Sequence, residues 1–130
     1  MSNNPIGFFD SGIGGITLWK EVHNLLPFEN KIYLADSINL PYGNKSDKEL
    51  EKISFKNSEF LLEKGCKLII VACNTATTKC IDNLRKKFDI PFIGIEPAIK
   101  PAVLNTKTGK VGVLATEGTL GSDLFYKTSN

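Results

Sequence analysis

Short apolar runs alternate with helix-like patterns along almost the whole chain, and this alternation limits the possible fold more than any other feature. Five runs are predicted to be strands: residues 5–10, 31–35, 68–73, 91–95 and 110–115. The run 68–73 is apolar throughout, as is typical of a central parallel strand covered on both faces. Strands separated by helices form βαβ units with parallel strands. The sequence therefore predicts an α/β domain with a parallel sheet and helices on both faces.

Helices are expected between these strands, over residues 16–26, 47–64, 77–88 and 99–104, and another is expected to start after Thr116. Ser46 followed by Glu49 is a capping-box pattern, which predicts the start of the second helix. Gly65 predicts its end. The apolar spacing of the first helix places four positions on one face: Ile16, Trp19, Val22 or His23, and Leu26.

Composition fits one globular domain, residues 1–130, because 42% of the residues are hydrophobic and 23% are charged. The sixteen basic and fourteen acidic residues give a formal net charge of +2, spread along the chain. Basic clusters interleaved with aromatic residues, which are typical of nucleic-acid binding, do not occur. We therefore expect no nucleic-acid partner.

The first ten residues lack the basic start and long apolar run of a signal peptide. The longest apolar run is far too short to span a bilayer, so no membrane partner is expected. Three cysteines, Cys66, Cys73 and Cys80, favour reduced thiols and a cytoplasmic location. Their spacing lacks a CxxC pair, and His23 is the single histidine, so no metal site is expected.

In a parallel α/β sheet, ligands bind beyond the carboxyl ends of the strands. This rule directs attention to the residues that directly follow each predicted strand. They are Asp10 and Ser11, Asp36, Cys73 to Thr75, Glu96 and Pro97, and Thr116.

The glycine-rich segment 10–15, DSGIGG, follows the first strand and resembles a dinucleotide-binding turn, with Asp36 closing the second strand. However, Thr17 stands where the third glycine is needed, and Asp10 would oppose a pyrophosphate at the helix N-terminus. Asp10 either caps the tight turn or faces a cationic group such as an amine, with Ser11 hydrogen-bonding beside it. A NAD-type oxidoreductase remains an alternative on the residues alone.

Cys73 lies where the third strand turns into a helix. A lone cysteine is often a core residue, but a helix N-terminus lowers a thiol pKa and raises its reactivity. Asn74 and Thr75 add amide and hydroxyl donors that suit a carboxylate. We therefore predict that Cys73 is catalytic and that Cys66 and Cys80 are structural.

Two further groups leave both a structural and a binding role open. Tyr42 and Gly43 belong either to a simple loop turn or to a pocket wall where the backbone approaches a ligand closely. Thr116 and Thr119 fit ordinary helix N-caps and also additional contacts to a substrate carboxylate.

Together these motifs resemble those of the aspartate/glutamate racemase family, and DSGIGG and PYG resemble its glutamate branch more than its aspartate branch. The matching segments are FFDSGIGG (8–15), LPYG with Lys45, ACNTAT (72–77), GIEPAIKPA (94–102) and GVLATEGT (112–119). They occur in the family's order and spacing and cover essentially the whole chain.

The resemblance implies two similar α/β domains with the substrate between them. It implies racemisation of L- and D-glutamate for peptidoglycan synthesis, with no pyridoxal phosphate, metal or other cofactor. Carried over by position, Cys73 is a catalytic acid/base thiol. The residues implied to bind substrate are Asp10, Ser11, Tyr42, Gly43, Asn74 and Thr75.

The family's second cysteine lies in a Gly-Cys-Thr-His motif of the other domain, which has no counterpart in these 130 residues. We therefore expect the chain to be an N-terminal racemase domain truncated near or before the domain boundary, and inactive alone. Aspartate racemisation and non-catalytic binding of a small acid remain alternatives. A homodimer of the full-length form is left open.

Overall fold

The computed structural model describes residues 3–123 and residue 126, and its centre is a four-stranded parallel sheet in the order β2-β1-β3-β4. The strands are β1 (Ile6–Asp10), β2 (Lys31–Ala35), β3 (Leu68–Val71) and β4 (Phe92–Gly94). Phe8 of β1 pairs with Tyr33 on one side and with Ile70 on the other. The first four predicted strands and their parallel arrangement are confirmed.

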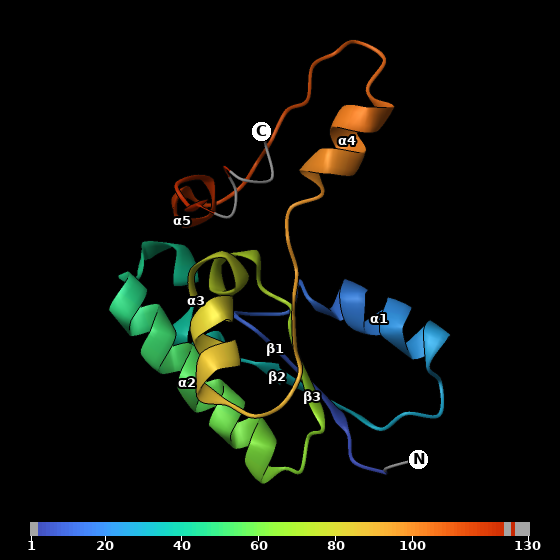
Figure 1. The fold of residues 1–130 in the computed structure, drawn as a ribbon, viewed down its shortest axis with the longest axis vertical. Coiled ribbons are helices and arrows are strands. Elements are labelled where there is room, and N and C mark those ends of the chain that lie inside the picture. The colour runs from blue at the N-terminus through green and yellow to red at the C-terminus, as the bar shows by residue number, and fades with distance from the viewer. Residues whose placement is uncertain (1–2, 124–125, 127–130) are drawn as a thin grey trace.

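Helices cover both faces of this sheet, as predicted. Helix α1 (Ile16–Leu25) lies on one face, and α2 (Asp47–Glu63) and α3 (Asn74–Lys87) lie on the other (Figure 1). Alternation along β1 divides the core: Phe8 belongs to the cluster against α1, and Phe9 belongs to the larger cluster against α2 and α3.

The ends of α2 follow the local sequence signals. The Ser46 hydroxyl accepts a hydrogen bond from the Glu49 N–H, and the Glu49 carboxylate accepts one from the Ser46 N–H, so the capping box is confirmed. Gly65 follows the helix with a φ of 80°. Glycine adopts this left-handed conformation without steric cost, which explains why the helix ends there.

The predicted apolar face of α1 is wrong in part. Ile16 and Leu26 are 39% and 47% exposed, whereas Leu18, Trp19 and Val22 pack against the core. Neighbouring apolar positions allow two helical faces, and the contact with Ile6, Phe8 and Ile70 selects the one that contains Leu18.

Helix α3 begins at Asn74, three residues before the predicted start, so Cys73 occupies its N-cap position. Thr77 was expected to begin this helix but lies within its first turn. Its hydroxyl donates to the Val71 carbonyl at 3.2 Å and accepts from the Ile95 N–H at 3.1 Å. These bonds hold α3 against the ends of β3 and β4.

The predicted fifth strand is wrong. Residues 110–115 are in no sheet ladder and are almost entirely exposed. After β4 the chain leads away from the sheet through α4 (Ile99–Asn105) and returns to a short helix α5 (Glu117–Leu120) beside α3 (Figure 1). An apolar run becomes a strand only where another strand satisfies its backbone, and none lies beside this one in the described part of the chain.

The helix expected after Thr116 does begin there, with the Thr116 hydroxyl accepting from the Thr119 N–H. The last residues of that expected helix lie outside the described residues. Among the residues that the structure describes, no helix has the length and apolar character needed to cross a membrane.

Candidate functional site

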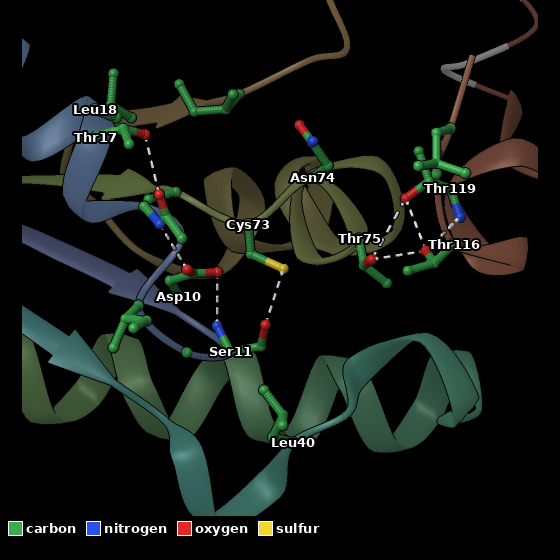
Figure 2. Close-up of a pocket in the computed structure, with 18 residues that line it drawn as sticks. Asp10, Ser11, Thr17, Leu18, Leu40, Cys73, Asn74, Thr75, Thr116 and Thr119 are labelled. Atoms are coloured by element: carbon green, nitrogen blue, oxygen red, sulfur yellow. Dashed lines mark hydrogen bonds between the residues drawn. The ribbon is translucent and has the colours of Figure 1, made fainter. Parts of the chain in front are cut away.

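A cavity of about 580 Å³ opens at the carboxyl ends of β1 and β3, where the strand-end rule places a ligand site (Figure 2). It is bounded by the glycine turn before α1, the start of α3, Leu40 and the segment that enters α5. Seven of the nine predicted site residues line it: Asp10, Ser11, Cys73, Asn74, Thr75, Thr116 and Thr119. The fold thus brings residues from three separate segments together.

Cys73 is 7% exposed and lies at the first turn of α3. Its thiol donates a weak hydrogen bond to the Ser11 hydroxyl, with 3.9 Å between sulfur and oxygen (Figure 2). Burial raises the pKa of the Cys73 thiol, and the Asp10 carboxylate adds to this, whereas the Ala76 N–H and Ser11 act in the opposite direction. The helix N-terminus thus acts in the expected direction through the Ala76 N–H, but the expected higher thiolate fraction is wrong, because burial outweighs the hydrogen bonds and the net pKa is raised.

Asp10 caps the glycine turn. Its two carboxylate oxygens accept from the Ser11 N–H at 2.8 Å and the Gly15 N–H at 2.9 Å. The Tyr33 hydroxyl lies 3.3 Å from the Asp10 carboxylate and 3.1 Å from the Gly12 carbonyl, and its hydrogen is directed at these two acceptors. Two N–H groups of the turn are therefore engaged by the Asp10 carboxylate, whose negative charge disfavours a pyrophosphate and with it the dinucleotide alternative.

Three threonine hydroxyls form a triangle at one end of the cavity (Figure 2). Thr75 lies 3.0 Å from Thr116 and 3.4 Å from Thr119, and Thr116 lies 3.1 Å from Thr119, all measured between hydroxyl oxygens. Thr116 is thus both a helix N-cap and a member of this cluster. Asn74 is exposed beside it.

The structure does not bring Tyr42 and Gly43 into the cavity lining. Tyr42, for which a loop turn and a pocket wall were both left open, is 2% exposed, and its hydroxyl donates to Asp36 at 2.6 Å. The buried carboxylate of Asp36 needs donors, which explains the inward position of Tyr42. Gly43 lies against Thr116, since a Cβ at Gly43 would come within 3.1 Å of the Thr116 side chain.

Sequence reasoning missed three residues around the site: Tyr33, Leu40 and Asn57. Tyr33 is a partly buried strand residue and Leu40 an apolar loop residue, so neither carries a local signal. Asn57 occurs at a buried position of α2, and a polar residue on an apolar helix face is the signal that could have identified it.

Cys66 and Cys80 are buried in the larger core cluster, in agreement with structural roles. Burial raises the pKa of Cys80 to about 11. Neither residue lines the cavity. Among residues 3–123 and 126, no group of three or more His, Cys, Asp or Glu side chains is arranged to hold a metal ion.

The fold and the site describe a parallel α/β domain with a thiol at the strand ends, and comparison with known families shows which family has this sequence. The sequence model of the Asp/Glu/Hydantoin racemase family matches residues 18–128. The chain belongs to this family.

Relatives within the family are named glutamate racemase. One, from Herpetosiphon aurantiacus, is 50% identical over 127 residues, which are 98% of this chain and 50% of that protein. The structure of Escherichia coli glutamate racemase in complex with L-glutamate and the activator UDP-MurNAc-Ala is 40% identical, with a TM-score of 0.88 over 95% of this chain and 47% of that one. The Francisella tularensis enzyme in complex with D-glutamate is 37% identical, with a TM-score of 0.83 over 99% and 49%. The chain spans about half the length of these relatives.

Proposed function

We propose that this chain is the N-terminal part of a cofactor-independent glutamate racemase and that Cys73 is one of its two acid/base thiols. The observation that carries the proposal is a buried thiol at the start of α3, on a cavity that also presents the Ser11 hydroxyl and three threonine hydroxyls. The names of the relatives support glutamate as the substrate.

Inversion at an α-carbon needs a base on one face and an acid on the other. The raised pKa of Cys73 keeps it as a neutral thiol near pH 7, which suits proton donation. The second cysteine, which the family resemblance implies outside these 130 residues, is proposed to act as the base on the opposite face of the α-carbon. In the reverse direction the two thiols exchange roles.

The substrate carboxylate is proposed to bind at the start of α3. Thr75 and Asn74 offer hydroxyl and amide donors there, and the helix N-terminus favours a negative charge. Thr116 and Thr119 extend the same set of hydroxyl donors. Charge that develops on the carboxylate side of the carbanion-like transition state would be stabilised by these groups.

Asp10 and Ser11 are proposed to lie beside the substrate amine, and Tyr42 and Gly43 to bind substrate in the full-length form. For Asp10, the turn-capping bonds support a positioning role at the same time. Three further properties stay predictions: supply of D-glutamate for peptidoglycan, a cytoplasmic location and a homodimer of the full-length form. Light scattering of that form would test the dimer.

Chiral chromatography tests the proposed function directly. A full-length form incubated with L-glutamate should produce D-glutamate, and L-aspartate should be a much poorer substrate. The isolated 130-residue chain should produce none, because it lacks the second thiol and leaves the cavity open to water.

Faster racemisation of L-aspartate than of L-glutamate would show that aspartate, and not glutamate, is the substrate. Absence of racemisation by the full-length form, with L-glutamate still bound, would favour the non-catalytic binder. Turnover by the isolated chain that disappears in a Cys73→Ala control would contradict the two-thiol mechanism.

A further inference from the structure

We propose that Asp36, Tyr42 and Asn57 form a positioning network that holds the loop 37–44 against the cavity, so that Asn57 governs substrate affinity without touching substrate. This inference rests on the proposed racemase function. The network joins the end of β2, the loop and the middle of α2.

The three side chains form a closed set of hydrogen bonds. The Tyr42 hydroxyl donates to Asp36 Oδ2 at 2.6 Å. The Asn57 side-chain amide nitrogen donates to this pair, 3.1 Å from Asp36 Oδ2 and 2.9 Å from the Tyr42 hydroxyl oxygen. Asn39 adds a donor to both Asp36 oxygens, at 2.8 and 2.9 Å. Every bond except the two from Asn57 arises within the segment 36–44, so Asn57 is the link to the helix.

Asp36 and Asn57 are both buried, so loss of the hydrogen bond between them cannot be made good by water. Asp36 is 6% exposed and Asn57 is 9% exposed. A buried carboxylate that loses donors is strongly destabilised, and it regains hydration if the loop moves outward. Loss of the Asn57 donors is therefore expected to loosen the loop rather than only to weaken α2.

The loop contacts the site at two points. Leu40 lines the cavity beside the glycine turn (Figure 2), and a Cβ at Gly12 would lie 3.4 Å from Leu40 Cδ1. Gly43 packs against Thr116 of the threonine triangle. A loosened loop would thus withdraw one wall of the cavity and the support of its hydroxyl cluster.

Asn57 itself is outside the residues that line the cavity. It therefore acts through Tyr42 and Asp36 and is a positioning residue. Replacement of Asn57 should raise the free energy needed to form the closed site, which is part of substrate binding. Proton transfer by the Cys73 thiol should be largely unchanged.

Kinetics of a full-length form test this inference with two variants and a control. Asn57→Leu keeps the branched arrangement of heavy atoms, although the side chain is larger, and removes the amide donor. We therefore expect KM for glutamate to rise about tenfold, the effect of one lost hydrogen bond to a charged group, with kcat within about twofold. Ser58→Ala is the control, because its hydroxyl is buried on the same helix but bonds to the Ser54 carbonyl instead of the loop. It should leave KM unchanged.

Asn57→Asp gives a signature that a purely structural role would not produce. At low pH the new carboxyl is protonated and can still donate to Asp36, whereas at higher pH it is a second carboxylate beside Asp36 and repels it. KM should therefore rise with pH more steeply in Asn57→Asp than in Asn57→Leu. The charged groups Lys56, Glu59 and Glu63 of α2 line the hollow beside Asp36, and Cys73 interacts electrostatically with Tyr42. All four are the same in both variants, so a difference between the variants comes from position 57.

Hydrogen–deuterium exchange separates this inference from the proposed function. Faster exchange of the Asn39 and Lys45 amides in Asn57→Leu, together with the raised KM, supports the network; both amides bond within the segment 36–45. Unchanged loop exchange, or faster exchange with an unchanged KM, would overturn it. If even the unmodified full-length form fails to racemise glutamate, the proposed function fails, and faster loop exchange would then support only the structural part.

Discussion

At the residue scale, the surroundings of Cys73 combine opposing effects on its ionisation. Burial raises the pKa of the thiol most, and the nearby Asp10 carboxylate raises it further, while the Ser11 hydroxyl and the Ala76 N–H lower it. A raised pKa means that the protonated form is favoured, so the thiolate fraction near neutral pH is smaller than for a free cysteine. The effect of the Asp10 carboxylate on the pKa of Cys73 can be removed by a single substitution.

Asp10→Asn should therefore lower the pKa of Cys73. The substitution removes a negative charge close to the thiol and keeps one side-chain oxygen for the turn, at a stability cost on the order of 1 kcal/mol. The pH at which iodoacetamide alkylation of Cys73 reaches half its maximal rate, followed by mass spectrometry, measures this shift. The midpoint should move to lower pH.

Cys80 is an internal reference in the same samples, because burial places its pKa at about 11. Asp82→Asn is a matched control, since Asp82 is an exposed carboxylate of α3 that has no part in the Cys73 shift. A midpoint that stays in place or moves to higher pH in Asp10→Asn would show that the carboxylate does not act on the thiol.

At the element scale, local signals predicted what local interactions decide. The capping box of Ser46 and Glu49 and the left-handed Gly65 are confirmed, because caps and helix ends depend on neighbours within a few residues. The strand 110–115 was wrong because strand formation depends on a distant partner. The face of α1 was partly wrong for the same reason, since the sheet selects among adjacent apolar positions.

The candidate site was predictable to a similar extent. The strand-end rule found Ser11, Cys73 and Thr75, because the topology alone places these positions at one edge of the sheet. The inward turn of Tyr42 was not predictable, since it depends on the buried Asp36 and on Asn57 of a different element. A hydrogen-bond network whose members come from different elements gives no recognisable pattern in the sequence of any one segment.

Ser46→Ala should destabilise α2 and lower the free energy of unfolding by about 1 kcal/mol, the usual cost of losing an N-cap side chain. Urea unfolding followed by circular dichroism measures the change. Lys48→Ala, an exposed change in the same turn, is the control and should stay within about 0.5 kcal/mol. Equal losses in both variants would mean that the capping box contributes nothing measurable.

At the scale of the whole molecule, the first part of the chain and the segment after β4 differ in packing. Residues 6–94 supply all four strands and most of the core, whereas Leu104 and Leu114 are largely exposed on the segment that leaves the sheet. That segment nevertheless returns Thr116 and Thr119 to the cavity. Together with the length of the relatives, of which this chain covers about half, these residues support the proposal that the chain is the N-terminal part of a longer racemase.

The central claim is that Cys73 is the catalytic thiol of this half-site, and racemisation by cysteine variants of a full-length form tests it most directly. Cys73→Ala and Cys80→Ala each remove one buried thiol of the same helix region, and they differ in that Cys73 lines the cavity. Chiral chromatography of D-glutamate formed from L-glutamate, with circular dichroism to confirm folding, compares them. We predict that Cys73→Ala is folded and inactive, whereas Cys80→Ala retains activity and loses on the order of 1 kcal/mol of stability. A folded Cys73→Ala that still racemises glutamate, or an inactive Cys80→Ala that is fully folded, would contradict the claim.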